Sequence, residues 1–216
     1  MKTFHTKTLT IALVGTALVI VSSTEIIDSV ADTNLLVHHG QHLLIILGGT
    51  MIGYAITSLY GIERNKTWSR VNSVWARLNR RGYIAGALFM AAFNFWHIPS
   101  VFVFTILEGN ESIHFLEHVT FFSTSVLLIA VTPFMSRAFK ALYIFVFGNM
   151  NSMMGVLYSV SGSGLFYPYP AYQQDQFGFL MSLSGLLTMT LGTFLYLYVG
   201  ERRLTTQGPT ISKSHP

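Results

Sequence analysis

The sequence has no cysteine, and only 10% of its 216 residues are charged. Without cysteine the chain cannot form disulfides, thiolate zinc sites, iron–sulfur clusters or a thiol-based route for copper transfer. A soluble domain carries roughly 25% charged residues, so the scarcity of charge also excludes a soluble enzyme. Any metal must be held by histidine, methionine or carboxylate side chains.

Several functional motifs are missing as well. The sequence has no Walker loop, dinucleotide fingerprint or nucleophile elbow, and no basic and aromatic pattern of the kind that binds nucleic acid.

Hydrophobic residues, in contrast, make up 51% of the chain and gather into six runs. A helix of about 20 residues crosses a hydrocarbon core of about 30 Å. We therefore predict an all-α fold, a polytopic integral membrane bundle of six transmembrane helices forming one domain over residues 1–216. The predicted spans are residues 8–27, 35–60, 83–107, 113–134, 138–160 and 177–199.

The first run has two interpretations. It reaches the length of a span only if Ile26 and Ile27 extend it. Its lysines, its apolar stretch and the segment from Val21 to Ser23 also resemble a cleavable signal peptide, which would leave five spans. The continuation from Glu25 to Asp28 has no obvious mature start, and this favours an uncleaved helix.

The charges indicate an orientation. All 13 Lys and Arg residues lie on segments that a six-span topology puts on one side of the membrane. The positive-inside rule therefore predicts that both termini are cytoplasmic.

On the same basic side of the membrane, residues 67–81 carry Trp68, Val71, Trp75 and Leu78 at helical spacing. We predict an amphipathic helix that anchors on the inner surface, with a docking surface for a cytoplasmic partner as the alternative.

Six of the eight histidines fall at one depth in this topology, near the outer surface. Residues four apart share a helix face, so His38 pairs with His42 and His114 pairs with His118. Ionisable groups within spans are costly and usually mark a site, whereas an isolated histidine such as His5 or His215 needs no function. We predict an outer-leaflet metal site. Its expected ligands are His38, His42, His97, His114 and His118, with Asp32, His39, Glu117, Met150 and Met154 as supporting or weaker candidates.

The residue types leave the ligand open. Imidazole suits copper, zinc, iron and nickel, and a pair of histidines on one helix can offer two nitrogens to one ion. A haem needs only one histidine on each side of its ring, so the pairs favour a bare ion or a two-metal centre. Met150 and Met154 share a helix face, and thioethers select Cu(I), although methionine is equally an ordinary core residue.

Two proline-containing segments adjoin these histidines. In Trp96–Pro99 the proline removes a helical hydrogen bond and should free the carbonyl of Phe95, which predicts a kink beside His97. The loop from Tyr167 to Tyr172 contains two Tyr-Pro pairs. It is suited either to an aromatic belt at the membrane interface, which we favour, or to a lid over the site.

Taken together, Trp96-His97-Ile98-Pro99 and His114-Phe115-Leu116-Glu117-His118 resemble the WHxP and HxxEH signature of CtaG-type proteins. These are membrane assembly factors of haem-copper cytochrome c oxidases. His38 to His42 and Gln173 to Gly178 match further features of that family. The resemblance implies a prokaryotic plasma-membrane protein whose histidines bind copper destined for an oxidase. Six predicted spans rather than about seven would make it a divergent short member.

The expected function is thus a non-enzymatic, metallochaperone-like role in maturing a copper-containing membrane complex, with the lipid bilayer and subunits of that complex as partners and no nucleic acid. One alternative is an accessory subunit of a respiratory oxidase or a copper-dependent monooxygenase. Another is a haem-bearing redox protein or a metal-dependent membrane enzyme in which Glu117 is a general base.

Overall fold

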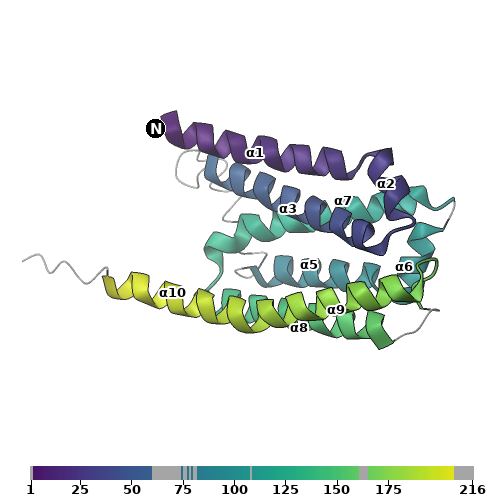
Figure 1. The fold of residues 1–216 in the computed structure, drawn as a ribbon. Helices are drawn as coiled ribbons and strands as arrows, with labels where there is room; N and C mark the ends of the chain where they lie inside the picture. The colour runs from purple at the N-terminus through teal and green to yellow at the C-terminus, as the bar shows by residue number, and fades with distance from the viewer. Residues whose placement is uncertain are drawn as a thin grey trace, which may run out of the picture.

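The computed structural model describes residues 2–59, 74, 77, 79, 82–107, 109–160 and 165–206. In this part of the chain every regular element is helical, which confirms the predicted all-α class. Figure 1 shows the long helices running side by side along one common direction. α1 (Lys2–Ser22) packs on α3 (Leu35–Leu59), and α3 packs on α7 (Glu111–Val131). α8 (Arg137–Val160) pairs with α9 (Ala171–Leu187).

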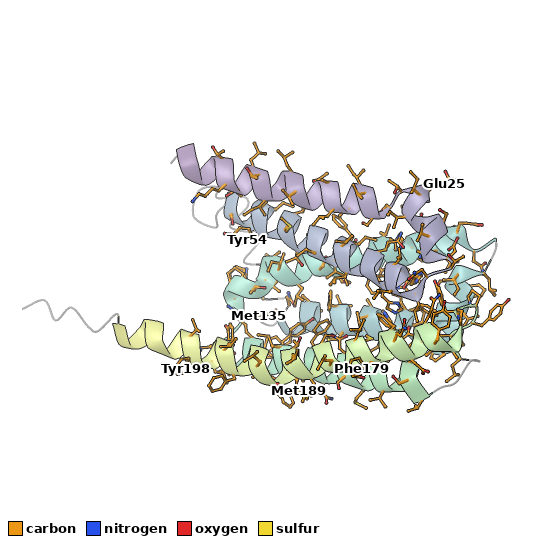
Figure 2. The ribbon with its side chains drawn as sticks, in the orientation of Figure 1. Glu25, Tyr54, Met135, Phe179, Met189 and Tyr198 are labelled. Carbon is orange, nitrogen blue, oxygen red and sulfur yellow. The ribbon has the colours of Figure 1, made fainter. Side chains whose placement is uncertain are left out.

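Four helical segments are long and apolar enough to cross a membrane, and two bent helix pairs bring the number to as many as six. The four are Leu35–Ser58, Glu111–Phe134, Arg137–Val160 and Ala171–Val199. Their outer surfaces are apolar: the side chain of Phe179 is 64% exposed, and Tyr54 and Tyr198 also project from the bundle (Figure 2). Such extensive exposed apolar surface is what a lipid-facing bundle requires.

The first run forms two helices. α1 ends at Ser22, and α2 (Glu25–Ala31) follows at an angle of 57°. Ile26 and Ile27 therefore belong to a second helix and do not extend the first one. Gln41 of α3 stabilises the break, because its Nε2 donates to the Ser22 carbonyl at 2.7 Å and also to the Asp28 carboxylate.

The third run is also divided, at the kink predicted beside His97. α5 (Tyr83–Trp96) and α6 (Pro99–Ile106) meet at an angle of 70°, which confirms that prediction. The expected free carbonyl of Phe95 was wrong, since the amide of Ile98 donates to it at 3.2 Å. The carbonyl of Phe93 instead lies 2.6 Å from Nδ1 of His97. The break thus holds the His97 ring against the end of α5.

The last span begins earlier than its apolar run. α9 starts at Ala171 and continues through a π-helical turn, η4 (Thr188–Gly192), into α10 (Thr193–Thr206). Two glutamines in its first turn explain the early start. Gln173 Oε1 accepts the Leu35 amide of α3 at 2.8 Å, and Gln174 Nε2 donates to the Tyr169 carbonyl at 2.8 Å. A polar first turn is therefore stabilised by contacts with other segments.

Glycines set the closest helix contacts. We call Gly148, Gly155, Gly178 and Gly185 the glycine seam, because they face one another across α8 and α9. A Cβ at Gly148 would lie 2.7 Å from the Gly185 carbonyl oxygen, and one at Gly155 would lie 2.5 Å from that of Gly178. Only glycine permits this approach.

Gly49 and Gly53 of α3 form a second close contact. A Cβ at Gly49 would lie 2.9 Å from the Phe122 carbonyl oxygen, and one at Gly53 would lie 3.0 Å from that of Val126. These two glycines thus allow α3 to pack closely on α7. The predicted amphipathic helix over residues 67–81 lies outside the described residues, apart from 74, 77 and 79, as do the side chains of His5 and His215.

Candidate metal centre

α3 carries the first histidine pair at its N-terminal end. Asn34 starts this helix, because its Oδ1 lies 3.1 Å from the amides of Leu36 and Val37, and a side chain that accepts from the first turn is the usual N-cap. His38 and His42 then follow one turn apart on the same face. Their side chains are only 0% and 3% exposed.

α7 carries the second set. It begins at Glu111, so His114, Glu117 and His118 all lie in its first two and a half turns. His114 and Glu117 are three residues apart and share a face directed at α3. Glu117 is completely buried, with 0% of its surface exposed. Both helices therefore present their polar side chains at the same end of the bundle.

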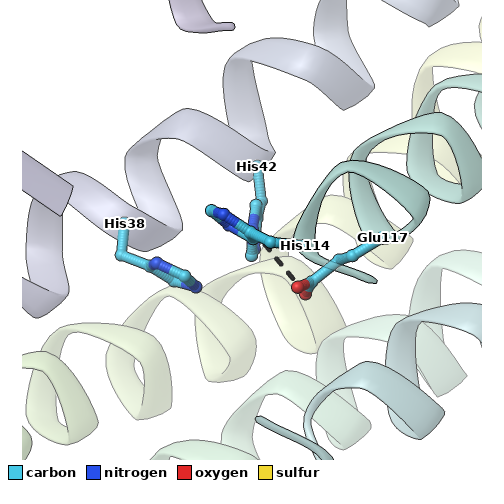
Figure 3. Close-up of side chains that lie close together, drawn as sticks. All are labelled: His38, His42, His114 and Glu117. Atoms are coloured by element: carbon cyan, nitrogen blue, oxygen red, sulfur yellow. Dashed lines mark ion pairs between the residues drawn. The ribbon is translucent and has the colours of Figure 1, made fainter. Parts of the chain in front are cut away.

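The two helices bring four of these side chains into one group, which we call the donor cluster: His38, His42, His114 and Glu117. Figure 3 shows the three rings and the carboxylate converging between α3 and α7. One ligand atom from each residue lies within 4.8 Å of the others, and Nε2 of His42 is 3.6 Å from Oε1 of Glu117. The rings of His38 and His114 stack at 5.3 Å with 7° between their planes.

The donor cluster has unused hydrogen-bonding capacity. Both ring nitrogens of His38 and His42, Nε2 of His114 and both oxygens of Glu117 are buried without a hydrogen-bond partner. Burying such groups unpaired costs several kcal/mol, and an isolated carboxylate costs more. A bound cation would neutralise the carboxylate and use the nitrogen lone pairs. Three imidazoles and one carboxylate are also a donor set that suits a first-row transition metal.

His118 and His97 adjoin this group without belonging to the four. The ring of His118 lies 4.4 Å from that of His114 and 5.3 Å from that of His42, and its Nε2 is buried without a partner. The ring of His97 lies 6.3 Å from that of His42, and it stacks on Phe93 at 4.4 Å. The predicted histidines from three helices therefore form one continuous cluster, and the four closest donors include Glu117 rather than His97 or His118.

His39 is buried in the same region but is occupied by the protein. Its Nδ1 lies 3.1 Å from the Leu35 carbonyl, and its Nε2 lies 3.0 Å from the hydroxyl of Tyr158. Both ring nitrogens thus have protein partners. This residue forms part of the wall of the cluster, where its ring also packs on Phe177 at 4.0 Å.

The remaining candidates lie around the cluster. Sδ of Met150 is 3.8 Å from Nδ2 of Asn94, and Met154 packs with the apolar core. Asp32 ends α2 on the outside of the bundle. Partial desolvation raises the pKa of its carboxyl, Asp28 and Glu111 raise it further, and His114 opposes them. The carboxyl groups of Asp28 and Asp32 thus lie close enough to His114 to interact with it electrostatically.

The Tyr-Pro loop supplies both a cover and exposed rings. Tyr169 is 2% exposed, its ring lies 6.0 Å from that of His38, and its hydroxyl donates to the Ala31 carbonyl at 2.7 Å. Tyr167 and Tyr172 are 59% and 61% exposed. Tyr169 is therefore part of the wall beside His38, whereas Tyr167 and Tyr172 are exposed, as the predicted interfacial belt would require. The sequence alone does not show that Tyr169 is buried while Tyr167 and Tyr172 are exposed.

The fold and the site together define a class: an all-α protein with four to six helical segments long and apolar enough to span a membrane, and a buried cluster of three histidines and one glutamate that could hold a metal ion. Comparison with known proteins adds no closer assignment. No protein-family model matches the chain, and no curated protein or solved structure matches it.

Proposed function

We propose that this protein binds copper at the donor cluster and takes part in the assembly or metallation of a copper-containing membrane complex, such as a haem-copper oxidase. The observation that carries the proposal is the arrangement of buried donors: ring nitrogens of three histidines without hydrogen-bond partners lie close to the buried carboxylate of Glu117, and Nε2 of His42 is 3.6 Å from it. In a span, such a group is stable only when its charge and lone pairs are satisfied.

The donor chemistry supports copper over other ions. For sites of nitrogen and oxygen donors, affinity among divalent first-row metals is highest for Cu²⁺. Imidazole nitrogen also serves Cu(I), whereas a site for Mg²⁺ or Ca²⁺ would be built almost wholly from oxygen. His118, whose Nε2 is buried and free, is available as a further nitrogen donor beside His114.

The assembly role rests on the resemblance of Trp96–Pro99 and His114–His118 to the CtaG signature. In this proposal six spans cross the plasma membrane of a prokaryote, the basic end of the bundle faces the cytoplasm, and the donor cluster faces outward. The protein acts without catalysing a reaction: α3 and α7 position the donors, and Tyr169 covers them. Copper, when bound, is cargo passed to a client complex.

The proposal is tested by elemental analysis with optical and electron paramagnetic resonance spectra, on protein purified from its native membrane in mild detergent. We expect about one copper per chain. Glu117→Gln, which keeps the shape of the side chain, and His42→Ala should each remove most of the copper. His39→Gln is the matched control: it removes a buried histidine of the same helix whose nitrogens are already occupied, so copper should stay bound.

Several outcomes would contradict the proposal. Unchanged copper in both Glu117→Gln and His42→Ala would mean that the donor cluster does not bind it. A Soret band would assign a haem instead. Folded protein that holds neither copper nor haem would show that the histidines form only a polar network. A stoichiometric complex that retains the copper would identify a resident accessory subunit rather than an assembly factor.

A further inference from the structure

A cavity of about 240 Å³ lies between α3, α7, α8 and α10, toward the end of the bundle opposite the donor cluster. Most of its wall is apolar and includes Leu128, Ile129, Met135 and Ile144. The volume is below the roughly 300–1,000 Å³ of pockets that enclose a drug-sized ligand. The cavity therefore suits part of a molecule whose remainder lies outside the protein.

The wall extends from the bundle end toward the bilayer centre. Lys140 lies in the first turn of α8, close to the end of the span. Ser125, also in the wall, precedes Phe134 at the other helix end by nine residues, or about 13 Å of helix. One leaflet contributes about half of a 30 Å hydrocarbon core, so the cavity follows most of the depth of a leaflet.

Three hydroxyl groups of the wall, those of Ser125, Thr132 and Tyr143, differ in whether they already have a hydrogen-bond partner. Ser125 and Thr132 donate to the carbonyls of Phe122 and Leu128, at 2.8 and 3.0 Å, so their hydroxyls are already used within α7. The hydroxyl of Tyr143, one turn beyond Lys140, is buried without a hydrogen-bond partner.

The charges at the mouth of the cavity are positive. Lys140 has no ion pair among the residues that the structure describes, and no carboxylate belongs to the cavity wall. Arg137, one turn earlier, donates to the Leu197 carbonyl, while its Nε has no partner. The cavity thus combines the Lys140 cation near the end of the bundle, the unpartnered Tyr143 hydroxyl one turn further along α8 and a mostly apolar interior.

We propose that this cavity binds one anionic phospholipid. The phosphate lies at the Lys140 ammonium, the Tyr143 hydroxyl donates to an ester carbonyl, and one acyl chain fills the space along Leu128 and Ile129. Basic pockets between transmembrane helices are known to recognise anionic headgroups, because the lipid supplies the counter-charge and the bilayer supplies the ligand at high local concentration.

Native mass spectrometry of the full chain tests this. The detergent-solubilised protein is incubated with an equal mixture of phosphatidylglycerol and phosphatidylcholine that have identical acyl chains. The mass spectrum then gives the number and type of lipids that stay bound to each protein molecule. We expect one retained lipid, with phosphatidylglycerol preferred about fivefold, the factor for one lysine near an anionic lipid. Lys140→Gln should remove most of the preference. Lys7→Gln, which removes an exposed lysine near the start of α1, is the matched control and should keep it.

Two further variants test the placement of the tail. Tyr143→Phe removes only the hydroxyl and should lower retention of both lipids while leaving the preference. Leu128→Trp fills the cavity and should lower retention of both as well. Equal retention of the two lipids by the wild type would overturn the proposal, as would identical behaviour of Lys140→Gln and Lys7→Gln. Full retention by a folded Leu128→Trp protein would overturn the acyl-chain site. The wild-type comparison decides even if a variant fails to fold.

Discussion

Gly155 of the glycine seam offers a sharp test of how α8 and α9 are held together. In Gly155→Ala the new Cβ would lie 2.4 Å from the amide nitrogen of Ser182 and 2.5 Å from the carbonyl oxygen of Gly178. Both are backbone atoms, so neither can rotate away as a side chain would. The two helices must separate locally, and their packing along the whole seam weakens.

The expected loss of stability in Gly155→Ala is best measured against Gly40→Ala, the same substitution at a helix position without close contacts. Overpacking a tight contact costs about 1–3 kcal/mol. Alanine also gains about 0.5–1 kcal/mol over glycine inside a helix. At Gly40 of α3 nothing lies within 4 Å of an added Cβ, so Gly40→Ala receives this gain alone. We therefore expect Gly40→Ala to be about 1–3 kcal/mol more stable than Gly155→Ala.

Thermal unfolding in one detergent, followed by circular dichroism, measures this difference. For a chain of this size 1 kcal/mol corresponds to about 2–4 °C in Tm. Gly155→Ala should melt below the wild type or close to it, and Gly40→Ala should melt above it. Equal melting temperatures for the two variants would refute the close approach of α8 and α9.

Three more measurements address the rest of the molecule. Tyr169→Phe loses the hydrogen bond to Ala31 and should lower stability by about 1 kcal/mol, seen as a small drop in Tm. Because the chain lacks cysteine, Lys7→Cys and Asp175→Cys should react with an impermeant thiol reagent from opposite sides of the membrane, and labelling from one side would refute the topology. Desolvation raises the pKa of Asp32, so its ionisation destabilises the fold as pH rises above the ordinary value of 3.8. Asp32→Asn should therefore raise Tm at pH 7, and the gain should vanish below that pKa.

The helices themselves were largely predictable, because a run of about 20 apolar residues is visible in the sequence without knowledge of the rest of the fold. The expected span at 138–160 differs from α8 (Arg137–Val160) by one residue, since charge and polar residues mark its start. The kink beside Pro99 is equally local. The break after Ser22 was not predictable, because it is stabilised by Gln41 of another helix. The early start of α9 depends likewise on Gln173 reaching Leu35.

The candidate site divides in the same way. The common depth of the histidines and the pairing of His38 with His42 follow from helical periodicity, which the sequence contains. Which donors come closest depends on how α3 and α7 are rotated about their axes. That rotation places Glu117 beside His42 at 3.6 Å, whereas the break between α5 and α6 places the ring of His97 6.3 Å from that of His42. The sequence indicated the place of Glu117 only through its position three residues after His114, which puts both side chains on one face of the helix.

The contact of Gly49 and Gly53 with α7 also bears on the distant donors. His42 precedes Gly49 by seven residues, about 10 Å along α3, and the two helices are rigid rods over that length. The separation of the imidazoles from the carboxylate is therefore set in part by the packing of Gly49 and Gly53 on α7, about two helical turns away from the donors. A side chain added at Gly49 or Gly53 would push α3 away from α7 and should therefore also move the histidines of α3 away from Glu117.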